Sequence, residues 1–178
     1  VNNATYGFRV RAGCRAVLLP HQISTVARCF ETTPVRYMLA DEVGLCKTVE
    51  ACSILSILAS EKKDLRVLII VPGALASQWK NELHYKYGLD AVIASPRAPI
   101  CLLPMEDIGK SLLTLSMPWD LAIVDETHRL LANDTWYSQV QNLSRKVTHI
   151  LLLSATPIQD RNEEYRRLLA LLNPEQYE

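Results

Sequence analysis

The sequence predicts an α/β domain with a mostly parallel central sheet and helices on both faces. Short apolar runs alternate with longer segments of helical periodicity, which is the order that a parallel sheet with crossover helices requires. The apolar runs are continuous rather than alternating, as expected of strands buried on both faces. With 178 residues, 49% of them hydrophobic, the chain is long enough to bury one substantial core. We therefore expect a single domain over residues 1–178.

The predicted strands are short apolar runs bounded by polar residues, glycine or proline. They are "YMLA" (37–40), "RVLIIVP" (66–72), "APICLL" (98–103), "DLAIVDE" (120–126) and "HILLLSA" (149–155). Segments 47–60 and 73–87 repeat apolar residues at the spacing of amphipathic helices. The repeating residues are Val49, Cys52, Ile54, Leu55 and Leu58 in the first segment, and Leu75, Trp79, Leu83 and Tyr87 in the second. Prolines divide residues 95–119 into loops and short elements.

Charge and cysteine content limit the function classes. Lysine plus arginine and aspartate plus glutamate both number 19, so the net charge does not indicate a dedicated nucleic-acid binder with a basic surface. The five cysteines lack the C-x-x-C spacing of a zinc site and are expected to be free thiols. No apolar run approaches the roughly 20 residues that cross a bilayer, and the polar start lacks the apolar region of a signal peptide. We expect a cytoplasmic protein without a membrane partner.

The stretch "MLADEVGLCKTVEA" (38–51) runs from a predicted strand through a loop into a helix. Such a loop directs backbone N–H groups and the positive end of the helix dipole towards a ligand, for which phosphate is the natural candidate. Lys47 would reach the β- and γ-phosphates of a nucleotide, and the Thr48 hydroxyl would bind Mg²⁺. The match to G-x-x-x-x-G-K-[ST] is incomplete, because Asp41 and Cys46 stand at the glycine positions. An ordinary helix start containing Lys-Thr remains an alternative at this point.

Two further motifs follow predicted strands. In "LAIVDETH" (121–128) two adjacent carboxylates end a strand, where they repel each other and need water, a cation or a hydrogen-bond donor. Asp125 is suited to hold Mg²⁺ through its water shell, and Glu126 to polarise the water that attacks a γ-phosphate. Ser154 and Thr156 follow the next strand with hydroxyl groups that are suited to contact the acid pair. A solvated, charged strand end is the alternative, but the order and spacing of the three motifs favour a nucleotide site.

Several segments occur together in an order that is typical of one family. They are "LLPHQ" (18–22), "LADEVGLCKTVEA" (39–51), "VLIIVPGALASQWKNEL" (67–83), "WDLAIVDETHRL" (119–130) and "ILLLSATPIQD" (150–160). On these segments the chain resembles the superfamily-two helicase-like ATPases of the Swi/Snf type, and among them the bacterial proteins that associate with RNA polymerase. The resemblance covers nearly the whole chain. It implies a three-layer RecA-like P-loop NTPase domain, the first of two RecA-like lobes.

The resemblance also implies roles for individual residues, with ATP and Mg²⁺ as cofactors. The implied nucleotide-binding residues are Gln22, which would read adenine, and Asp41, Glu42, Val43, Gly44, Leu45, Cys46, Lys47 and Thr48. The implied catalytic residues are Lys47, Asp125 and Glu126, with Thr48 and Asp125 at the metal. The implied coupling residues between nucleotide and DNA are His128, Ser154 and Thr156, and the residues implied at the nucleic-acid backbone are Gly73, Ala74 and Gln78. A surface histidine is an equally weighted alternative for His128, and Trp79 is expected in the core.

In this family ATP binds between two lobes, and the second lobe supplies arginine fingers. We expect the second lobe to lie outside this chain, since Arg161, Arg166 and Arg167 match no finger motif and fall in a helical segment expected to be solvated. A missing finger costs roughly 10³ to 10⁵ in rate, so the isolated lobe should be nearly inactive. In the longer protein, ATP hydrolysis would drive tracking along double-stranded DNA and displace or remodel a bound protein, with RNA polymerase as one candidate. The implied location is the bacterial cytoplasm, at the nucleoid.

Cys46 keeps an alternative function open. The family has glycine at this position because the backbone comes very close to the phosphates. If positive φ is needed there, a cysteine costs on the order of 1 kcal/mol or more. The chain could therefore be a nucleotide-impaired pseudo-ATPase that serves as a DNA- or protein-binding module, although retained Asp125 and Glu126 argue against it. A small-molecule kinase fits the loop and acid pair but leaves "PHQ" and "SATP" unexplained.

Overall fold

The computed structural model describes residues 18–40, 47–155 and 162–177, and its sheet confirms the predicted fold class. The strands are β1 (Arg36–Ala40), β2 (Val67–Val71), β3 (Val92–Ile93), β4 (Ile100–Pro104), β5 (Leu121–Val124) and β6 (His149–Ser154). They form one six-stranded sheet in the order β1-β6-β5-β2-β4-β3, in which every neighbouring pair is parallel. Each predicted strand overlaps an observed one. Only β3 has no counterpart in the prediction, because two residues carry no periodicity.

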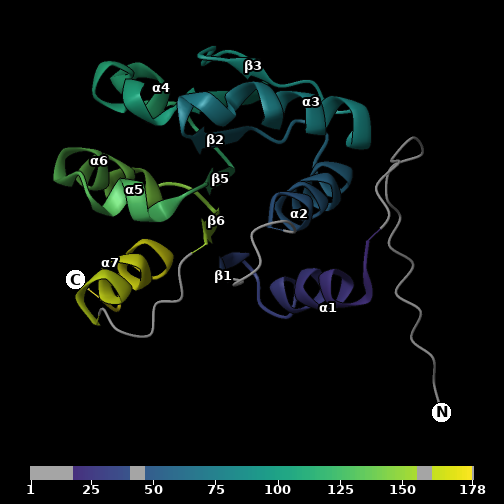
Figure 1. Ribbon diagram of the computed structural model, residues 1–178, viewed down its shortest axis with the longest axis horizontal. Helices are drawn as coiled ribbons and strands as arrows, with labels where there is room; N and C mark the ends of the chain where they lie inside the picture. The colour runs from purple at the N-terminus through teal and green to yellow at the C-terminus, as the bar shows by residue number, and fades with distance from the viewer. Residues whose placement is uncertain (1–17, 41–46, 156–161, 178) are drawn as a thin grey trace.

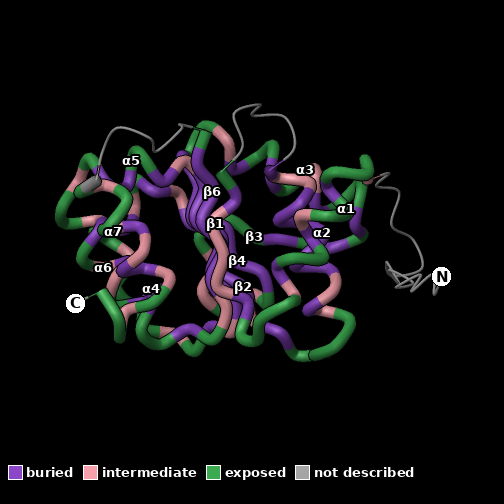
Figure 2. The backbone as a smooth tube through the Cα atoms, turned by 90° about the horizontal axis from the view of Figure 1, so that it is seen from below, coloured by how far each residue is buried: buried purple, intermediate pink, exposed green. Residues whose placement is uncertain are grey.

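The helices lie in two layers, one on each face of the sheet (Figures 1 and 2). One layer contains α1 (Pro20–Cys29), α2 (Lys47–Glu61), the 3-10 turn η1 (Gly73–Leu75) and α3 (Ala76–Tyr87). The other contains the 3-10 helix η2 (Met105–Lys110), α4 (Leu112–Ser116), α5 (Thr127–Leu131), α6 (Asp134–Ser144) and α7 (Asn162–Leu172). None of the helices within the described ranges has the length and apolarity needed to span a membrane.

Successive strand residues contribute to two separate hydrophobic cores. In β2, the side chains of Val67, Ile69 and Val71 pack against the α1–α3 layer, while those of Leu68 and Ile70 pack against the α4–α7 layer. This alternation follows from the two-residue period of a strand. Because both faces are covered, every residue of β2 is buried. The continuous apolar runs in the sequence are therefore explained by burial on both sides.

Helix α2 differs from the amphipathic helix that its sequence predicts. Lys47, Glu50, Ser53 and Ser56 are buried along with the apolar residues of this helix. Its position accounts for the difference, since α2 lies in the middle of its layer and contacts α1 on one side and α3 on the other. Little of its circumference is left for solvent.

Polar groups are closely paired at the amino edge of the sheet, where the parallel strands begin. The guanidinium of Arg36, the first residue of β1, donates hydrogen bonds to the carbonyl oxygens of Leu172 (2.5 Å), Val147 (2.8 Å), Ser144 (2.9 Å) and Leu171 (2.9 Å). It thereby caps the C-terminal ends of α6 and α7, whose last carbonyls have no partner within the helix. One side chain thus holds two helices against the first strand.

Three more polar contacts lie at the same edge. The carboxylate of Asp120 accepts hydrogen bonds from the Lys62 ammonium (2.7 Å) and from the backbone N–H of Arg66 (2.8 Å). The Nδ1 atom of His149 accepts one from the backbone N–H of Val35 (3.0 Å). The start of each central strand is therefore fixed by a side-chain hydrogen bond to backbone or by an ion pair.

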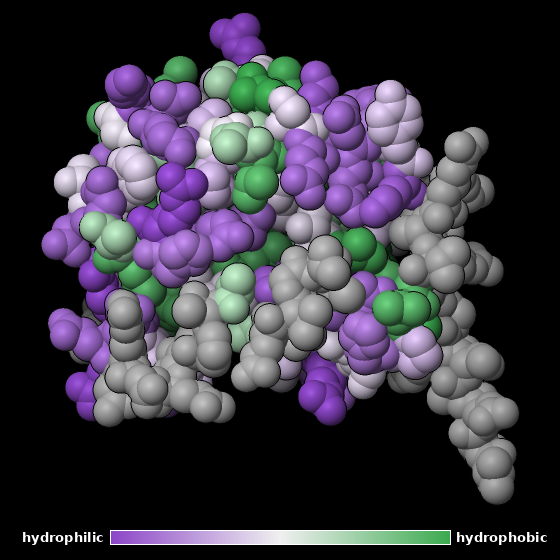
Figure 3. Space-filling model, viewed as in Figure 1, coloured by the Kyte–Doolittle hydropathy of each residue, from purple (hydrophilic) through white to green (hydrophobic). Residues whose placement is uncertain are grey.

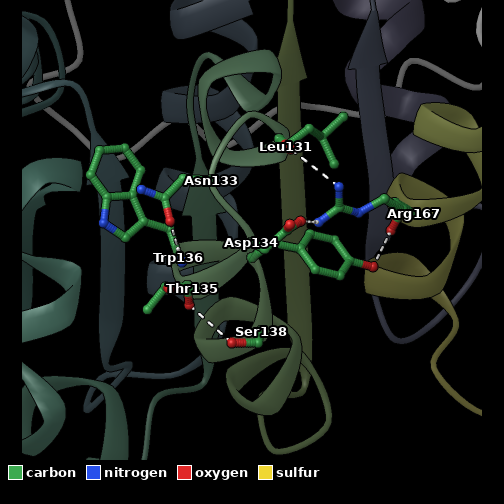
Figure 4. Close-up of polar contacts among 8 residues, drawn as sticks. Leu131, Asn133, Asp134, Thr135, Trp136, Ser138 and Arg167 are labelled. Carbon is green, nitrogen blue, oxygen red and sulfur yellow. Dashed lines mark hydrogen bonds and ion pairs between the residues drawn. The ribbon is translucent and has the colours of Figure 1, made fainter.

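Helix α7 is attached to α6 through Arg167, which corrects the expectation of a solvated side chain (Figure 4). The Arg167 guanidinium binds the Asp134 carboxylate at 2.8 Å, donates to the Leu131 carbonyl oxygen at 3.2 Å and stacks over the Tyr137 ring at 4.0 Å. The Tyr137 hydroxyl in turn donates to the Arg167 carbonyl oxygen at 2.9 Å. Arg166 is exposed as expected, whereas Arg161 lies outside the described residues.

Candidate functional site

The predicted motifs meet at the carboxyl ends of three neighbouring strands. Strand β6 lies between β1 and β5, and Ala40, the last residue of β1, pairs with Ser154, the last residue of β6. On the other side of β6, Leu152 pairs with Val124, after which the chain continues directly into the acid pair. Because parallel strands end at the same edge, Ala40 at the end of β1, the buried Ser154 and the acids are close together.

Asp125 follows β5 directly and is only 7% exposed. Its Oδ2 atom accepts a hydrogen bond from the Trp79 indole N–H at 2.9 Å, and its Oδ1 atom accepts one from the backbone N–H of Glu126 at 2.8 Å. Burial raises the pKa of the Asp125 carboxyl above its ordinary value, although these two hydrogen bonds and the Lys47 charge act in the opposite direction. The Lys47 ammonium is therefore within electrostatic range of Asp125.

Glu126 takes a left-handed backbone conformation, with φ 49° and ψ 53°. For a residue with a side chain this conformation costs on the order of 1 kcal/mol, and such strain is often found at functional sites. The turn ends the predicted strand 120–126 two residues early and begins α5. It leaves the Glu126 carboxylate 3.1 Å from Nδ1 of His128, whose side chain is half exposed. His128 thus faces both the catalytic candidate and solvent.

Lys47 and Thr48 begin α2, with Lys47 buried and Thr48 half-buried. Thr156 lies outside the described residues, and so do the remaining predicted loop residues. Those loop residues are Asp41, Glu42, Val43, Gly44, Leu45 and Cys46. The donors that are described suit a magnesium nucleotide, since Mg²⁺ prefers hydroxyl and carboxylate oxygens and a lysine ammonium suits phosphate. The residues present therefore fit the predicted cofactors.

Gln22, the predicted adenine reader, lies in α1 and is 3% exposed. Its side-chain oxygen accepts a hydrogen bond from the backbone N–H of Leu19 at 2.8 Å and so caps the start of α1. Gln22 would consequently contact a purine through its side-chain amide N–H groups, which would donate hydrogen bonds to the base.

The residues predicted at nucleic acid, Gly73, Ala74 and Gln78, are all exposed along η1 and α3. The backbone N–H of Gly73 already donates to Oε2 of Glu106 at 2.9 Å, and the other oxygen of that carboxylate is 3.7 Å from the Arg129 guanidinium. A phosphate that binds the Gly73 N–H must displace this carboxylate. Figure 3 shows mainly hydrophilic side chains over α3, α5 and α6, with hydrophobic ones in small areas.

Three features of the site have no counterpart in the sequence prediction. The Trp79 indole N–H carries no signal, because a tryptophan at helical spacing with leucines predicts core packing alone. The Thr127 hydroxyl is fully buried and lacks a hydrogen-bond partner in the part of the chain that the structure describes. Glu106 did carry a signal, since it lies three residues after the predicted strand 98–103.

Comparison with known proteins assigns the family. The SNF2-related domain matches residues 21–95 and 103–178. An uncharacterized ATP-dependent helicase, YqhH of Bacillus subtilis, is 39% identical and aligns with 88% of this chain and 29% of its own length. RNA polymerase-associated protein RapA of Haemophilus influenzae is 37% identical over 93% of this chain and 20% of its own length. The chain therefore spans less than a third of these curated relatives.

The fold has a close structural counterpart. The SWI2/SNF2 ATPase core of Sulfolobus solfataricus, solved in complex with double-stranded DNA, superimposes with a TM-score of 0.82 at 21% identity, over 92% of this chain and 37% of that one. This likeness confirms the RecA-like α/β fold. Together with the match over most of its length, it identifies the chain as a member of the SNF2-related, Swi/Snf-type family of helicase-like ATPase domains.

Proposed function

We propose that this chain is the ATP-binding lobe of a Swi/Snf-type DNA-dependent ATPase that moves along double-stranded DNA and displaces or remodels a bound protein. The observation that carries the proposal is the meeting of Lys47, the Asp125–Glu126 pair and Ser154 at one edge of three adjacent parallel strands. This arrangement supports a magnesium nucleotide, because a cation for phosphate lies within electrostatic range of a carboxylate that suits a metal.

Within this proposal each residue has a defined task. Lys47 binds the β- and γ-phosphates, and the oxygens of Thr48 and Asp125 hold the metal, largely through water. Magnesium, when bound, neutralises charge that develops on the phosphates. Glu126, whose left-handed backbone begins α5, orients and deprotonates the attacking water. His128, 3.1 Å from Glu126, couples this group to the DNA side together with Ser154 and Thr156.

The remaining roles concern partners. Gln22 contacts adenine, and Gly73, Ala74 and Gln78 contact the DNA backbone. A second RecA-like lobe supplies arginine fingers and completes the ATP site. RNA polymerase is one candidate for the displaced protein, because the name of the RapA relatives states that association. These roles apply to a longer protein, of which the present chain is one lobe.

A nucleotide titration tests the proposal. A fluorescent ATP analogue with Mg²⁺ is titrated into the native chain and into Lys47→Ala, with Lys63→Ala, which removes an exposed lysine, as the matched control. We expect binding by the native chain and Lys63→Ala, and loss of most of it in Lys47→Ala. Equal signals from all three proteins would contradict the assignment of the loop. In the longer protein, duplex DNA should raise the ATPase rate.

A pseudo-ATPase that acts as a DNA- or protein-binding module is the second candidate, and Cys46 at the loop glycine favours it. The same titration with Cys46→Gly separates the two. If the native chain binds, the loop tolerates cysteine and the ATPase assignment stands. If only Cys46→Gly binds, this chain has a disabled phosphate loop and the binding module is the better assignment.

A further inference from the structure

Trp79 makes one contact that core packing does not require. The residue is 1% exposed, within the core between α3 and the sheet. Its indole N–H points at Asp125 and donates to Oδ2 at 2.9 Å. A phenylalanine would fill much of the same volume without a polar atom. A buried indole donor costs free energy unless it is paired, so the contact with the carboxylate is a specific feature of this site.

The two hydrogen bonds to Asp125 fix the orientation of its carboxylate. Trp79 holds Oδ2 and the backbone N–H of Glu126 holds Oδ1. A carboxylate that is held at both oxygens cannot rotate about its χ2 angle without losing a bond. Each oxygen still has a lone pair for water or metal, because a carboxylate accepts about four hydrogen bonds in total.

A residue that orients another must itself be rigid, and α3 meets this condition. Near its C-terminal end, the Tyr87 hydroxyl donates to the Val49 carbonyl oxygen at 2.9 Å and lies 3.0 Å from the Ser53 hydroxyl. Both contacts are on α2, the helix that begins with Lys47. At the other end, α3 is preceded directly by η1, whose first residue, Gly73, donates its N–H to Glu106 at 2.9 Å. Helix α3 is thus fixed between the predicted phosphate helix and the acid pair.

We propose that Trp79 is a positioning residue for the metal site, whose indole N–H sets the orientation in which Asp125 meets Mg²⁺. The inference rests on the proposed function, since it assigns a partner to the predicted metal-holding carboxylate. Groups that hold a metal-binding side chain in place typically contribute 10- to 100-fold to metal affinity. Trp79 does not touch the metal or the nucleotide; it acts through Asp125.

The test removes the indole N–H donor in two variants, one of which keeps the full bulk of the side chain. The variants are Trp79→Phe and the replacement of Trp79 by β-(3-benzothienyl)alanine, which has sulfur in place of the N–H group. The matched control is Trp119→Phe, because Trp119 is also buried and donates its indole N–H, at 2.7 Å, to the Thr114 carbonyl oxygen in the opposite core. Affinity for the fluorescent ATP analogue is measured once with Mg²⁺ and once with EDTA.

We expect both Trp79 replacements to lower the affinity measured with Mg²⁺ by about tenfold and to leave the affinity in EDTA within twofold. Trp119→Phe should change neither. The proposal is overturned if the benzothienyl variant binds as the native chain does, or if Trp79→Phe and Trp119→Phe lose affinity equally in both buffers. The benzothienyl variant preserves the shape of the side chain, so a folding defect in Trp79→Phe does not decide the outcome.

A second readout separates this inference from the proposed function. The indole N–H resonances of Trp79 and Trp119 are followed in ¹⁵N-labelled native chain while Mg²⁺ alone is added. We expect the Trp79 resonance to shift and the Trp119 resonance to stay. If no nucleotide binds but Trp79 shifts, the proposed function fails for this chain and the positioning role stands. If nucleotide binds with Mg²⁺ and the Trp79 resonance does not shift when Mg²⁺ is added, the positioning role fails and the proposed function stands.

Discussion

The two edges of the same sheet differ in how well their polar groups are satisfied. At the amino edge, Arg36 makes hydrogen bonds to the ends of two helices, Asp120 is bonded twice, and His149 is bonded to backbone. At the carboxyl edge, Glu126 has a strained backbone and the Thr127 hydroxyl lacks a partner among the described residues. The amino edge is built for stability, whereas the carboxyl edge carries unfavourable features side by side.

This difference indicates where function lies. Strain and unsatisfied polar groups persist in a folded protein when the surrounding structure outweighs them, and they gather at sites that act on ligands. Here they coincide with the acid pair that the sequence singles out. The well-bonded amino edge stabilises the ends of the same strands and so offsets these costs. Substitutions at the two edges should therefore have opposite consequences for stability.

The largest effect is expected at Arg36. Arg36→Met removes the charged donor from several partly buried carbonyl oxygens, and each such hydrogen bond contributes about 1.5–3 kcal/mol. We expect the free energy of unfolding to fall by about 3 kcal/mol or more, measured by urea denaturation. Arg166→Met, which removes an exposed arginine from α7, should change it by less than about 0.5 kcal/mol. Similar losses in the two variants would remove the distinction between the edges.

A smaller effect of opposite sign is expected at Glu126. Glu126→Gly relieves about 1–2 kcal/mol of backbone strain in the folded state. It also lowers the free energy of unfolding by about 0.4–1 kcal/mol, because glycine gives the unfolded chain more conformational freedom. The net expectation is a gain of roughly 0.5–1 kcal/mol. Ala94→Gly is the control, because Ala94 has φ 54° in an exposed loop far along the chain from the acids.

Both glycine variants should gain similar stability in urea denaturation, but only Glu126→Gly should impair ATP hydrolysis in the longer protein. A loss of stability in Glu126→Gly beside a gain in Ala94→Gly would show that the carboxyl edge stores no strain at this residue.

The smallest effect concerns pH. Although burial acts to raise it, the pKa of Asp120 is lowered by the hydrogen bonds from Lys62 and from the Arg66 N–H. A lowered folded-state pKa stabilises the protein above the ordinary carboxyl pKa near 3.8, and this contribution is lost as pH falls through the folded value. Asp120→Asn should therefore flatten the decline in stability below roughly pH 4 by about 1 kcal/mol or less.

Asp90→Asn is the control for this pH series, because the Asp90 side chain is 84% exposed. The free energy of unfolding of Asp90→Asn should decline below roughly pH 4 as steeply as that of the native chain. If the two variants decline alike, the Asp120 pair contributes nothing specific to the amino edge.

The sequence predicts the sheet well and the contacts between elements poorly. Continuous apolar runs identify buried strands because burial on both faces leaves a local pattern. The same logic locates Asp125, Glu126 and Ser154, which simply follow such runs. The roles of Arg36 and Trp79 leave no local pattern, since each depends on residues that are 46 or more positions away. The prediction of a solvated Arg167 side chain is wrong for the same reason, because its partners on α5 and α6 are set by tertiary packing.

The two separate cores also affect how the molecule opens. Strands β2, β5 and β6 contribute side chains to both cores, so loss of either helix layer leaves them covered on the remaining face. Their amide hydrogens are expected to exchange with solvent only when the whole chain unfolds, whereas those of the two-residue edge strand β3 exchange by local fraying. The acid pair is thus attached to the slowest-exchanging part of the protein. A ligand bound there contacts the end of a sheet that stays intact while the helices around it fluctuate.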